Sequence, residues 1–203
     1  MTGEWFATAI EYLGVFAFAV SGFRIAATKR YDIFGAAVVG FATAVGGGTL
    51  RDVLIDQPVF WMESPNYLVC TLASFVFYAL FRNQVNKFGE TIRLFDTLGL
   101  AMFNMMGIKA ALGAGYGMLV AVIMGVVTGA AGGVFRDLLS QVPPLIFQKS
   151  EIYASACLLG GMTYAAGTAL GLHDIGVQSA AILVVIVVRI LSRARNITLP
   201  YAP

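Results

Sequence analysis

Charged residues are scarce in this 203-residue sequence, which has 13 Lys or Arg and 11 Asp or Glu, together 12% of the chain. A soluble domain carries about a quarter charged residues. So few charges cannot cover a globular surface without leaving large apolar patches exposed, which excludes a soluble enzyme and a disordered chain. The net charge of +2 comes from basic residues that are spread singly along the sequence, so we expect no nucleic acid among the partners.

Cysteine and histidine are nearly absent. Cys70 and Cys157, the two cysteines, lie in apolar runs, which favours two buried thiols over a disulfide or a metal site. The single histidine, His173, has no second histidine or cysteine nearby, which argues against a transition-metal site. The sequence also lacks a zinc-protease motif and a phosphate-binding loop, and Glu11 with Asp96 is the one conceivable pair of catalytic carboxylates. We therefore predict no catalytic residues, no metal, no cofactor and no enzymatic activity.

Apolar residues make up 59% of the sequence, and its mean hydropathy is +0.81, which indicates an all-α polytopic membrane protein. A helix needs about 20 mostly apolar residues to cross a membrane, because a rise of about 1.5 Å per residue must span about 30 Å of hydrocarbon. Seven such windows fill most of the chain, so we expect a single membrane domain over residues 1–203, surrounded by a lipid bilayer. The windows are residues 5–24, 33–50, 64–81, 94–109, 110–135, 152–172 and 175–188.

The basic residues are distributed unevenly about these windows. With seven crossings, Arg51 and Lys109 lie on the side of the N-terminus, and the other eleven of the 13 basic residues lie on the opposite side. Lys and Arg concentrate in the cytoplasmic loops of membrane proteins. We therefore expect the N-terminus to lie outside and the C-terminus to lie in the cytoplasm.

The sequence repeats itself after 85 residues. Residues 11–58 align without a gap on residues 96–143 with 15 identities, which include a shared Gly-Gly-x-x-Arg-Asp motif. Charges that differ in type keep their sign, as Glu11 and Asp96 do. Chance matches between Gly-rich and Ala-rich segments do not produce an aligned motif of this length, so we interpret the match as an internal repeat.

Each copy of the repeat spans three predicted helices. Residues 4–88 form the first repeat, residues 89–173 form the second, and residues 174–203 contain the seventh helix and a short C-terminal tail. Since three is an odd number of crossings, the second copy enters the membrane upside down. Inverted repeats of this kind are typical of transporters and channels, whose sites lie at the repeat interface.

Glycines cluster in the second and fifth predicted helices, and two compatible interpretations apply. Rows of small residues let membrane helices approach closely. Successive glycines also weaken a helix, by about 1 kcal/mol each relative to Ala, and invite a kink or an unwound turn whose free carbonyls line a cavity. A threonine one turn before each cluster is expected to bond such carbonyls or an ion. The predicted pore kinks are Gly46, Gly47, Gly48, Gly132 and Gly133, and the pore threonines are Thr43 and Thr128.

Six charged residues near the ends of the repeated helices are candidates for the pore and its gating. Such residues are costly in a membrane and usually face a cavity or a partner, although Arg and Lys also extend from helix ends to the interface. Because adjacent residues on a helix point about 100° apart, we expect the Arg and Asp of one dipeptide not to satisfy each other. We predict instead that Lys109 pairs with Asp52 and that Arg24 pairs with Asp137. The six candidates are Arg24, Arg51, Asp52, Lys109, Arg136 and Asp137.

The motifs Gly-Gly-Gly-Thr-Leu-Arg-Asp at 46–52 and Gly-Gly-Val-Phe-Arg-Asp at 132–137 resemble those of the prokaryotic branch of the trimeric intracellular cation channel (TRIC) family, also catalogued as glycine-transporter-like bacterial membrane proteins. The resemblance implies a homotrimer in a bacterial or archaeal plasma (inner) membrane, with one pore per protomer at the interface of the repeats. The glycine-kinked second and fifth helices would line each pore, and monovalent cations (K⁺ and Na⁺) would permeate, with potassium favoured. A secondary transporter of a small zwitterion such as glycine is the alternative, since broken helices suit both functions.

Overall fold

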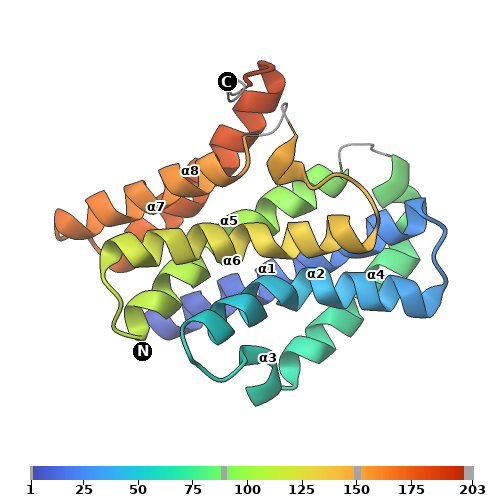
Figure 1. Ribbon diagram of the computed structural model, residues 1–203, viewed down its shortest axis with the longest axis horizontal. Coiled ribbons are helices and arrows are strands. Elements are labelled where there is room, and N and C mark those ends of the chain that lie inside the picture. The colour runs from blue at the N-terminus through green and yellow to red at the C-terminus, as the bar shows by residue number, and fades with distance from the viewer. Residues whose placement is uncertain (1, 88–90, 149–151, 199–203) are drawn as a thin grey trace.

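The computed structural model describes residues 2–87, 91–148 and 152–198, and all regular structure in these residues is helical (Figure 1). Seven of the described helices have 16 residues or more, and two short elements connect them. The elements are α1 (Thr2–Thr28), α2 (Ile33–Leu54), α3 (Phe60–Glu63), α4 (Asn66–Lys87), α5 (Thr91–Gly113), α6 (Met118–Leu139), the 3₁₀ turn η1 (Leu145–Phe147), α7 (Ala154–Ala169) and α8 (Asp174–Ala194).

Five of the described helices, α1, α2, α4, α6 and α8, are long and apolar enough to cross a membrane. The chain is therefore an all-helical membrane protein. The helices α5 and α7 coincide with the fourth and sixth predicted windows, but α5 carries three charged residues and α7 has only 16 residues. The fifth predicted window, residues 110–135, is entered through a glycine-rich turn at residues 113–117, and the structure has this turn between α5 and α6. The fourth predicted window stops at Lys109, four residues before α5 ends at Gly113. A lysine fits inside this helix since Lys109 Nζ lies 3.0 Å from Asp174 Oδ2.

The turns that follow corresponding helices have the same conformation in both halves of the chain. Arg30, after α1, has φ 57°, and Gly115, which is 85 residues later, has φ 87°. Asp56, after α2, has φ 53°, and Gln141, again 85 residues later, has φ 52°. Left-handed conformations are uncommon for residues other than glycine, so their recurrence indicates that the two halves follow the same local path. The predicted boundary between the repeats, at residues 88 and 89, lies outside the described residues.

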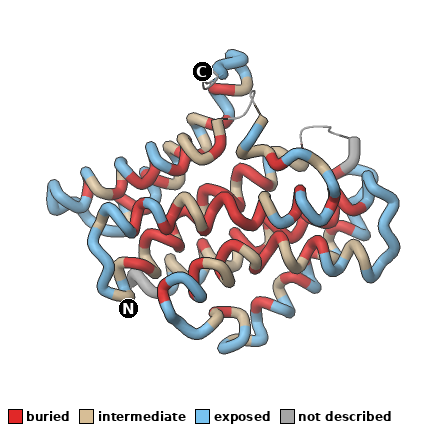
Figure 2. The backbone as a smooth tube through the Cα atoms, in the orientation of Figure 1, coloured by how far each residue is buried: buried red, intermediate tan, exposed pale blue. Residues whose placement is uncertain are grey.

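The helices α1, α2, α5 and α6 form the centre of the bundle. Helix α1 packs against α2 and α5, while α6 packs against α5 and α2. The buried rings of Phe18 in α1 and Phe103 in α5 stack with their centroids 5.4 Å apart. Buried residues concentrate along this centre, and exposed residues occupy the outer faces and the ends (Figure 2). Exposed side chains such as Ile33, Leu80 and Leu119 keep the outside apolar, as an extended lipid-facing surface requires.

Helix α4 and the pair α7–α8 flank this centre on different sides (Figure 1). Helix α4 packs against α1 and α2, which belong to the first half of the chain. Helices α7 and α8 pack against each other and against α5 in the second half. The placement of α8 therefore decides which charged side chains it can reach.

Candidate functional site

The helices α2 and α6 cross with their backbones in contact, at two glycines that correspond in the repeat. A Cβ atom added to Gly47 would collide with the carbonyl oxygen of Thr128, and one added to Gly132 would lie 2.6 Å from the carbonyl oxygen of Thr43. Only glycine therefore fits at either position without moving the opposite helix. As α2 advances from residue 43 to residue 47, its contact in α6 moves back from 132 to 128, so the two helices run antiparallel through the crossing.

Both helices remain α-helical through their glycine clusters. The unwound turn expected from three successive glycines is not formed, because the space beside each glycine is filled and the backbone keeps its helical hydrogen bonds. A Cβ added to Gly46 would lie 2.6 Å from the Phe135 ring, and one added to Gly48 would lie 2.5 Å from the Phe60 ring. Gly133 faces the hydroxyl of Tyr153 in the same way. These contacts agree with the close-packing interpretation of the glycines.

The two predicted pore threonines lie at this crossing and are fully buried. The Thr43 hydroxyl donates to the Val39 carbonyl at 2.6 Å, and the Thr128 hydroxyl donates to the Met124 carbonyl at 2.6 Å. Each hydroxyl therefore bonds the preceding turn of its own helix. The expected bonds to carbonyls freed by an unwound turn are not made, because no such turn is formed in α2 or α6.

Each Arg-Asp dipeptide forms its own ion pair, contrary to the expectation from helix geometry. Arg51 Nε donates to Asp52 Oδ1 at 2.7 Å, and Arg136 Nε donates to Asp137 Oδ1 at 2.8 Å. The 100° rule describes the directions of the Cβ atoms, whereas the guanidinium lies at the end of a long stem that folds back to its neighbour.

The second oxygen of each aspartate holds the start of the segment that follows its helix. Asp52 Oδ2 accepts from the Phe60 N–H at 2.9 Å, and Asp137 Oδ2 accepts from the Leu145 N–H at 3.0 Å. The two backbone donors are themselves 85 residues apart. The repeated motif therefore makes the same set of contacts twice, and each dipeptide fixes the direction in which the chain leaves its helix.

A buried charge cluster lies at the C-terminal end of α6. Asp96 is fully buried and accepts from Arg136 Nη1 at 2.6 Å, from Arg189 Nη1 at 2.7 Å and from the Tyr153 hydroxyl at 3.1 Å. Arg136 Nη1 also donates to Ser21 Oγ at 2.6 Å. We call this set, which comprises Ser21, Asp96, Arg136, Asp137, Tyr153 and Arg189, the α6-end cluster.

Sequence reasoning missed three members of the α6-end cluster. Arg189 is one of the eleven basic residues that were assigned to the cytoplasmic side, and Ser21 and Tyr153 carried no signal of their own. The sign-preserving recurrence of Glu11 and Asp96 was the available clue that a buried carboxylate needs a cation in each half. It could not show that the second cation comes from α8, outside the repeat.

A second cluster lies at the C-terminal end of α2. The Tyr67 hydroxyl donates to Glu11 Oε2 at 2.5 Å, and the Arg51 guanidinium lies over the Phe60 ring at 5.4 Å from its centroid. Arg51 Nη1 is buried and has no hydrogen-bond partner among the described residues. We call Glu11, Arg51, Asp52, Phe60 and Tyr67 the α2-end cluster. Because Glu11 and Asp96 belong to different clusters with different partners, they do not form a carboxylate dyad.

The cross-repeat pairs predicted for the remaining charges are wrong. Lys109 Nζ donates to Asp174 Oδ2 at 3.0 Å rather than to Asp52, because α8 begins beside the end of α5. Arg24 is half-buried, and its Nε has no hydrogen-bond partner among the described residues. Asp137 is held by Arg136 and by a backbone N–H instead.

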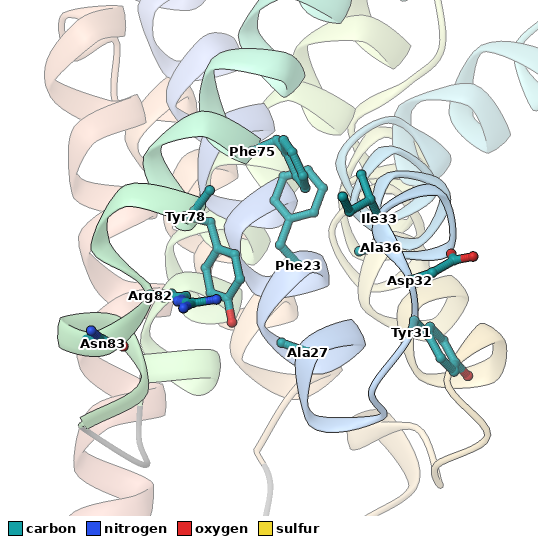
Figure 3. Close-up of a pocket in the computed structure, with 11 residues that line it drawn as sticks. Phe23, Ala27, Tyr31, Asp32, Ile33, Ala36, Phe75, Tyr78, Arg82 and Asn83 are labelled. Carbon is teal, nitrogen blue, oxygen red and sulfur yellow. The ribbon is translucent and has the colours of Figure 1, made fainter.

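A groove of about 600 Å³ opens on the outside of the bundle between α1, the start of α2 and the end of α4. Its walls include Phe23, Ile33 and Phe75, and the Arg82 and Tyr78 side chains lie next to each other along α4 (Figure 3). The groove contains none of the predicted site residues. The described part of the chain has no cluster of three His, Cys, Asp or Glu side chains that could hold a metal ion.

Comparison with known proteins gives matches over nearly the whole chain. The family model described as glycine transporter matches residues 8–83 and 93–169, one range inside each predicted repeat. The inner membrane protein YadS of Escherichia coli K12 is 36% identical over 187 residues, which are 91% of this chain and 89% of YadS. A TRIC trimeric intracellular cation channel orthologue from Rhodobacter sphaeroides has a TM-score of 0.87 at 33% identity, covering 94% of this chain and 98% of that one. A prokaryotic TRIC channel crystallised in 0.5 M KCl has a TM-score of 0.86 at 30% identity, covering 96% and 99%.

Proposed function

The chain belongs to the prokaryotic branch of the trimeric intracellular cation channel family, which the glycine transporter family model also describes, and we propose that it is a potassium-favouring channel for monovalent cations. Each protomer of a homotrimer has its own pore, which runs between α2 and α6 at the interface of the two halves. The conformation described here is closed, because the backbones of α2 and α6 touch at Gly47 and Gly132.

The reciprocal contact of α2 with α6 is the observation that carries the proposal. Gly47 meets Thr128 and Gly132 meets Thr43, so exchanging the halves reproduces the same contact. Two antiparallel copies of one helix, related in this way, are the expected core of an inverted repeat with its pathway at the interface. In the proposal, α5 and α7 cross the membrane as well, which gives seven crossings. The charge of Asp96 in α5 is matched inside the bundle by two arginines.

Basic residues along a pathway repel cations, and in this protein buried carboxylates balance them. Counted as ionised, the α2-end cluster has one cation and two carboxylates, a sum of −1, and the α6-end cluster has two of each. A pathway that passes both clusters therefore presents no excess positive charge. Rings of carbonyls and carboxylates favour cations in channels, so this balance supports cation rather than anion flux.

The proposed membrane is the inner membrane, as in the name of the Escherichia coli relative. In this orientation the N-terminus lies outside and the C-terminus lies in the cytoplasm, because eleven of the 13 basic residues then face inward. The α2-end cluster lies toward the outer side and the α6-end cluster toward the inner side, since α2 and α6 run in opposite directions.

Single-channel recording of the purified protein in a planar bilayer tests the proposal. Under a KCl gradient we expect unitary currents that reverse near the potassium equilibrium potential. Gly132→Ala should alter these currents because its Cβ would lie 2.6 Å from Thr43 in the opposite helix. Gly176→Ala is the matched control, because a Cβ there meets nothing within 4 Å, and its currents should equal those of the unmodified protein.

The same protein in vesicles separates the channel from the transporter alternative. Saturable glycine uptake that depends on an ion gradient, without unitary currents in the bilayer, would overturn the channel proposal. Unitary potassium currents without gradient-driven glycine uptake support it. The continuity of α2 and α6 favours the channel, because a transporter of this type uses the ends of broken helices to hold its substrate.

A further inference from the structure

In the ion pairs described above, the charged side chains that α8 pairs with lie in the second half of the chain. Its Arg189 binds Asp96, and its Asp174 binds Lys109. The residues that correspond in the first half are Glu11 and Arg24, 85 positions earlier. Neither has a partner from α8 among the contacts of the described residues. The two ends of the proposed pathway are therefore built from the same repeated residues but differ in how their charges are satisfied.

The difference is sharpest at the two repeated arginines, which are both almost fully buried. Arg136 Nη1 makes two hydrogen bonds, to Asp96 and to Ser21, each at 2.6 Å. Arg51 Nη1 makes none among the described residues. The position that corresponds to Ser21 is Met106, which offers no hydroxyl.

Glu11, the carboxylate that corresponds to Asp96, accepts from a tyrosine as Asp96 does, but no arginine donates to it among the described residues. Glu11 Oε2 accepts from the Tyr67 hydroxyl at 2.5 Å, and Glu11 is near enough to Arg51 to interact with its charge. The Tyr67 ring packs edge-on against Phe60 at 4.7 Å, and Phe60 lies under the Arg51 guanidinium. Tyr67 and Arg51 thus flank one aromatic side chain, and Tyr67 alone of the two donates to the Glu11 carboxylate.

We propose that Glu11 is a gating residue that exchanges the Tyr67 hydroxyl for Arg51 Nη1. The Glu11–Arg51 pair closes the α2 end of the pathway, as the Asp96–Arg136 pair closes the α6 end. In the structure described here Asp96 is paired with Arg136 at the α6 end, whereas Glu11 is not paired with Arg51 at the α2 end. A buried guanidinium N–H without a partner is costly. The exchange gives Arg51 Nη1 a hydrogen-bond acceptor and leaves the Tyr67 hydroxyl without one. A neutral hydroxyl without a partner costs less than an unpaired charge, because solvent or Phe60 accommodates it more easily. The exchange itself is a property of the folded protein, but its role as a gate rests on the proposed channel function.

Recording of Tyr67→Phe tests the gate. This change removes the competing hydroxyl but keeps the ring against Phe60, so Glu11 should pair with Arg51 and open probability should fall about tenfold, within the usual range of coupling between sites. Adding Glu11→Gln to Tyr67→Phe should restore it, because the neutral amide cannot form the ion pair. Tyr116→Phe is the matched control, since Tyr116 is exposed in the turn after α5, and it should leave open probability unchanged. If Tyr67→Phe stays within about twofold of the unmodified channel, well below that coupling, Arg51 Nη1 is satisfied in another way and the proposal is wrong.

A thermal-unfolding cycle tests the exchange without any current. The unfolding constants of Glu11→Gln, of Arg51→Lys and of the double variant are measured, both in the otherwise unmodified protein and in the Tyr67→Phe protein. Lysine is chosen because it keeps the positive charge beside Asp52 but lacks the second nitrogen of the guanidinium. The effects of the two substitutions should add in the unmodified protein and should be coupled, by about tenfold in the unfolding constant, when Tyr67→Phe is present. Coupling between the two substitutions without unitary currents would overturn the channel function but support the exchange. Currents with no coupling in the Tyr67→Phe protein would overturn the exchange and leave the channel function standing.

Discussion

Replacing Asp96 with asparagine removes the carboxylate that two arginines share. Asp96 is 0% exposed, with Arg136 Nη1 at 2.6 Å and Arg189 Nη1 at 2.7 Å. The isosteric amide keeps the shape of the side chain and one acceptor oxygen, but it carries no charge. The two buried guanidinium groups are then left with Asp137 as their only carboxylate in the α6-end cluster, which changes from a neutral set to one with an excess positive charge.

The cost follows from the burial of these groups. Removing one partner of a buried ion pair costs about 3–5 kcal/mol, because the remaining charge stays buried without compensation. Since the amide still accepts one hydrogen bond, we expect the lower end, about 3 kcal/mol. In a protein of this size each kcal/mol lowers the melting temperature by about 2–4 °C, so Asp96→Asn should melt about 6–12 °C below the unmodified protein.

Thermal unfolding of the detergent-purified protein measures this shift. Asp56→Asn is the matched control, because Asp56 is exposed and has φ 53°, a conformation that asparagine tolerates well. It should melt within about 1 °C of the unmodified protein, as surface substitutions do. Adding Arg189→Met to Asp96→Asn should recover part of the loss, since it removes one uncompensated cation. If Asp96→Asn melts together with the Asp56→Asn control, the charge balance of the α6-end cluster does not stabilise the fold and our reasoning about it fails.

Two further predictions concern the helix crossing and the charge pair at the start of α8. Gly47→Ala and Gly132→Ala each push a methyl group into the opposite backbone, and such overpacking costs about 1–3 kcal/mol of stability. The control Gly176→Ala should melt no lower than the unmodified protein. Equal melting temperatures of all three variants would refute the close crossing. Lys109→Met breaks a pair whose side chains are 34% and 49% exposed, so its cost should stay below about 1 kcal/mol and shrink further at high salt. A larger loss than that of Asp96→Asn would show that the pair with Asp174 is more important than its exposure indicates.

The close crossing of α2 and α6 is the part of this molecule that the sequence predicts best. An 85-residue shift aligns Gly47 with Gly132 and Thr43 with Thr128, and the structure brings all four to one crossing. Glycines at corresponding positions in two long apolar helices indicate a close approach, because small residues are what close helix packing in a membrane requires. Whether the helices unwind there depends on what fills the space beside each glycine, and that comes from side chains distant in sequence, such as Phe135 and Tyr153.

The partners of the charges could not be predicted from the repeat. Helical geometry separates Arg51 from Asp52 at the Cβ atoms, but it leaves out the reach of the arginine side chain, so the pair within the dipeptide was missed. The partner of Lys109 and the second arginine of Asp96 come from α8, which has no copy in the repeat. Repeat symmetry could therefore only suggest partners within the two halves, and both pairs suggested in this way are wrong.

In the proposed channel, the position of α8 makes the two ends of the pathway unequal. If the two repeats made the same contacts, rearranging the charged residues would cost the same free energy at both ends of the pathway. Arg189 breaks this equality, since it gives Asp96 a second cation that Glu11 lacks. A carboxylate held by two buried arginines is costly to release, whereas one held by a single tyrosine hydroxyl gives up one hydrogen bond to a charged group, which contributes about 1.5–3 kcal/mol. The charged side chains at the α2 end therefore rearrange with the smaller change in free energy. We expect a gate at the α2 end rather than at the α6 end.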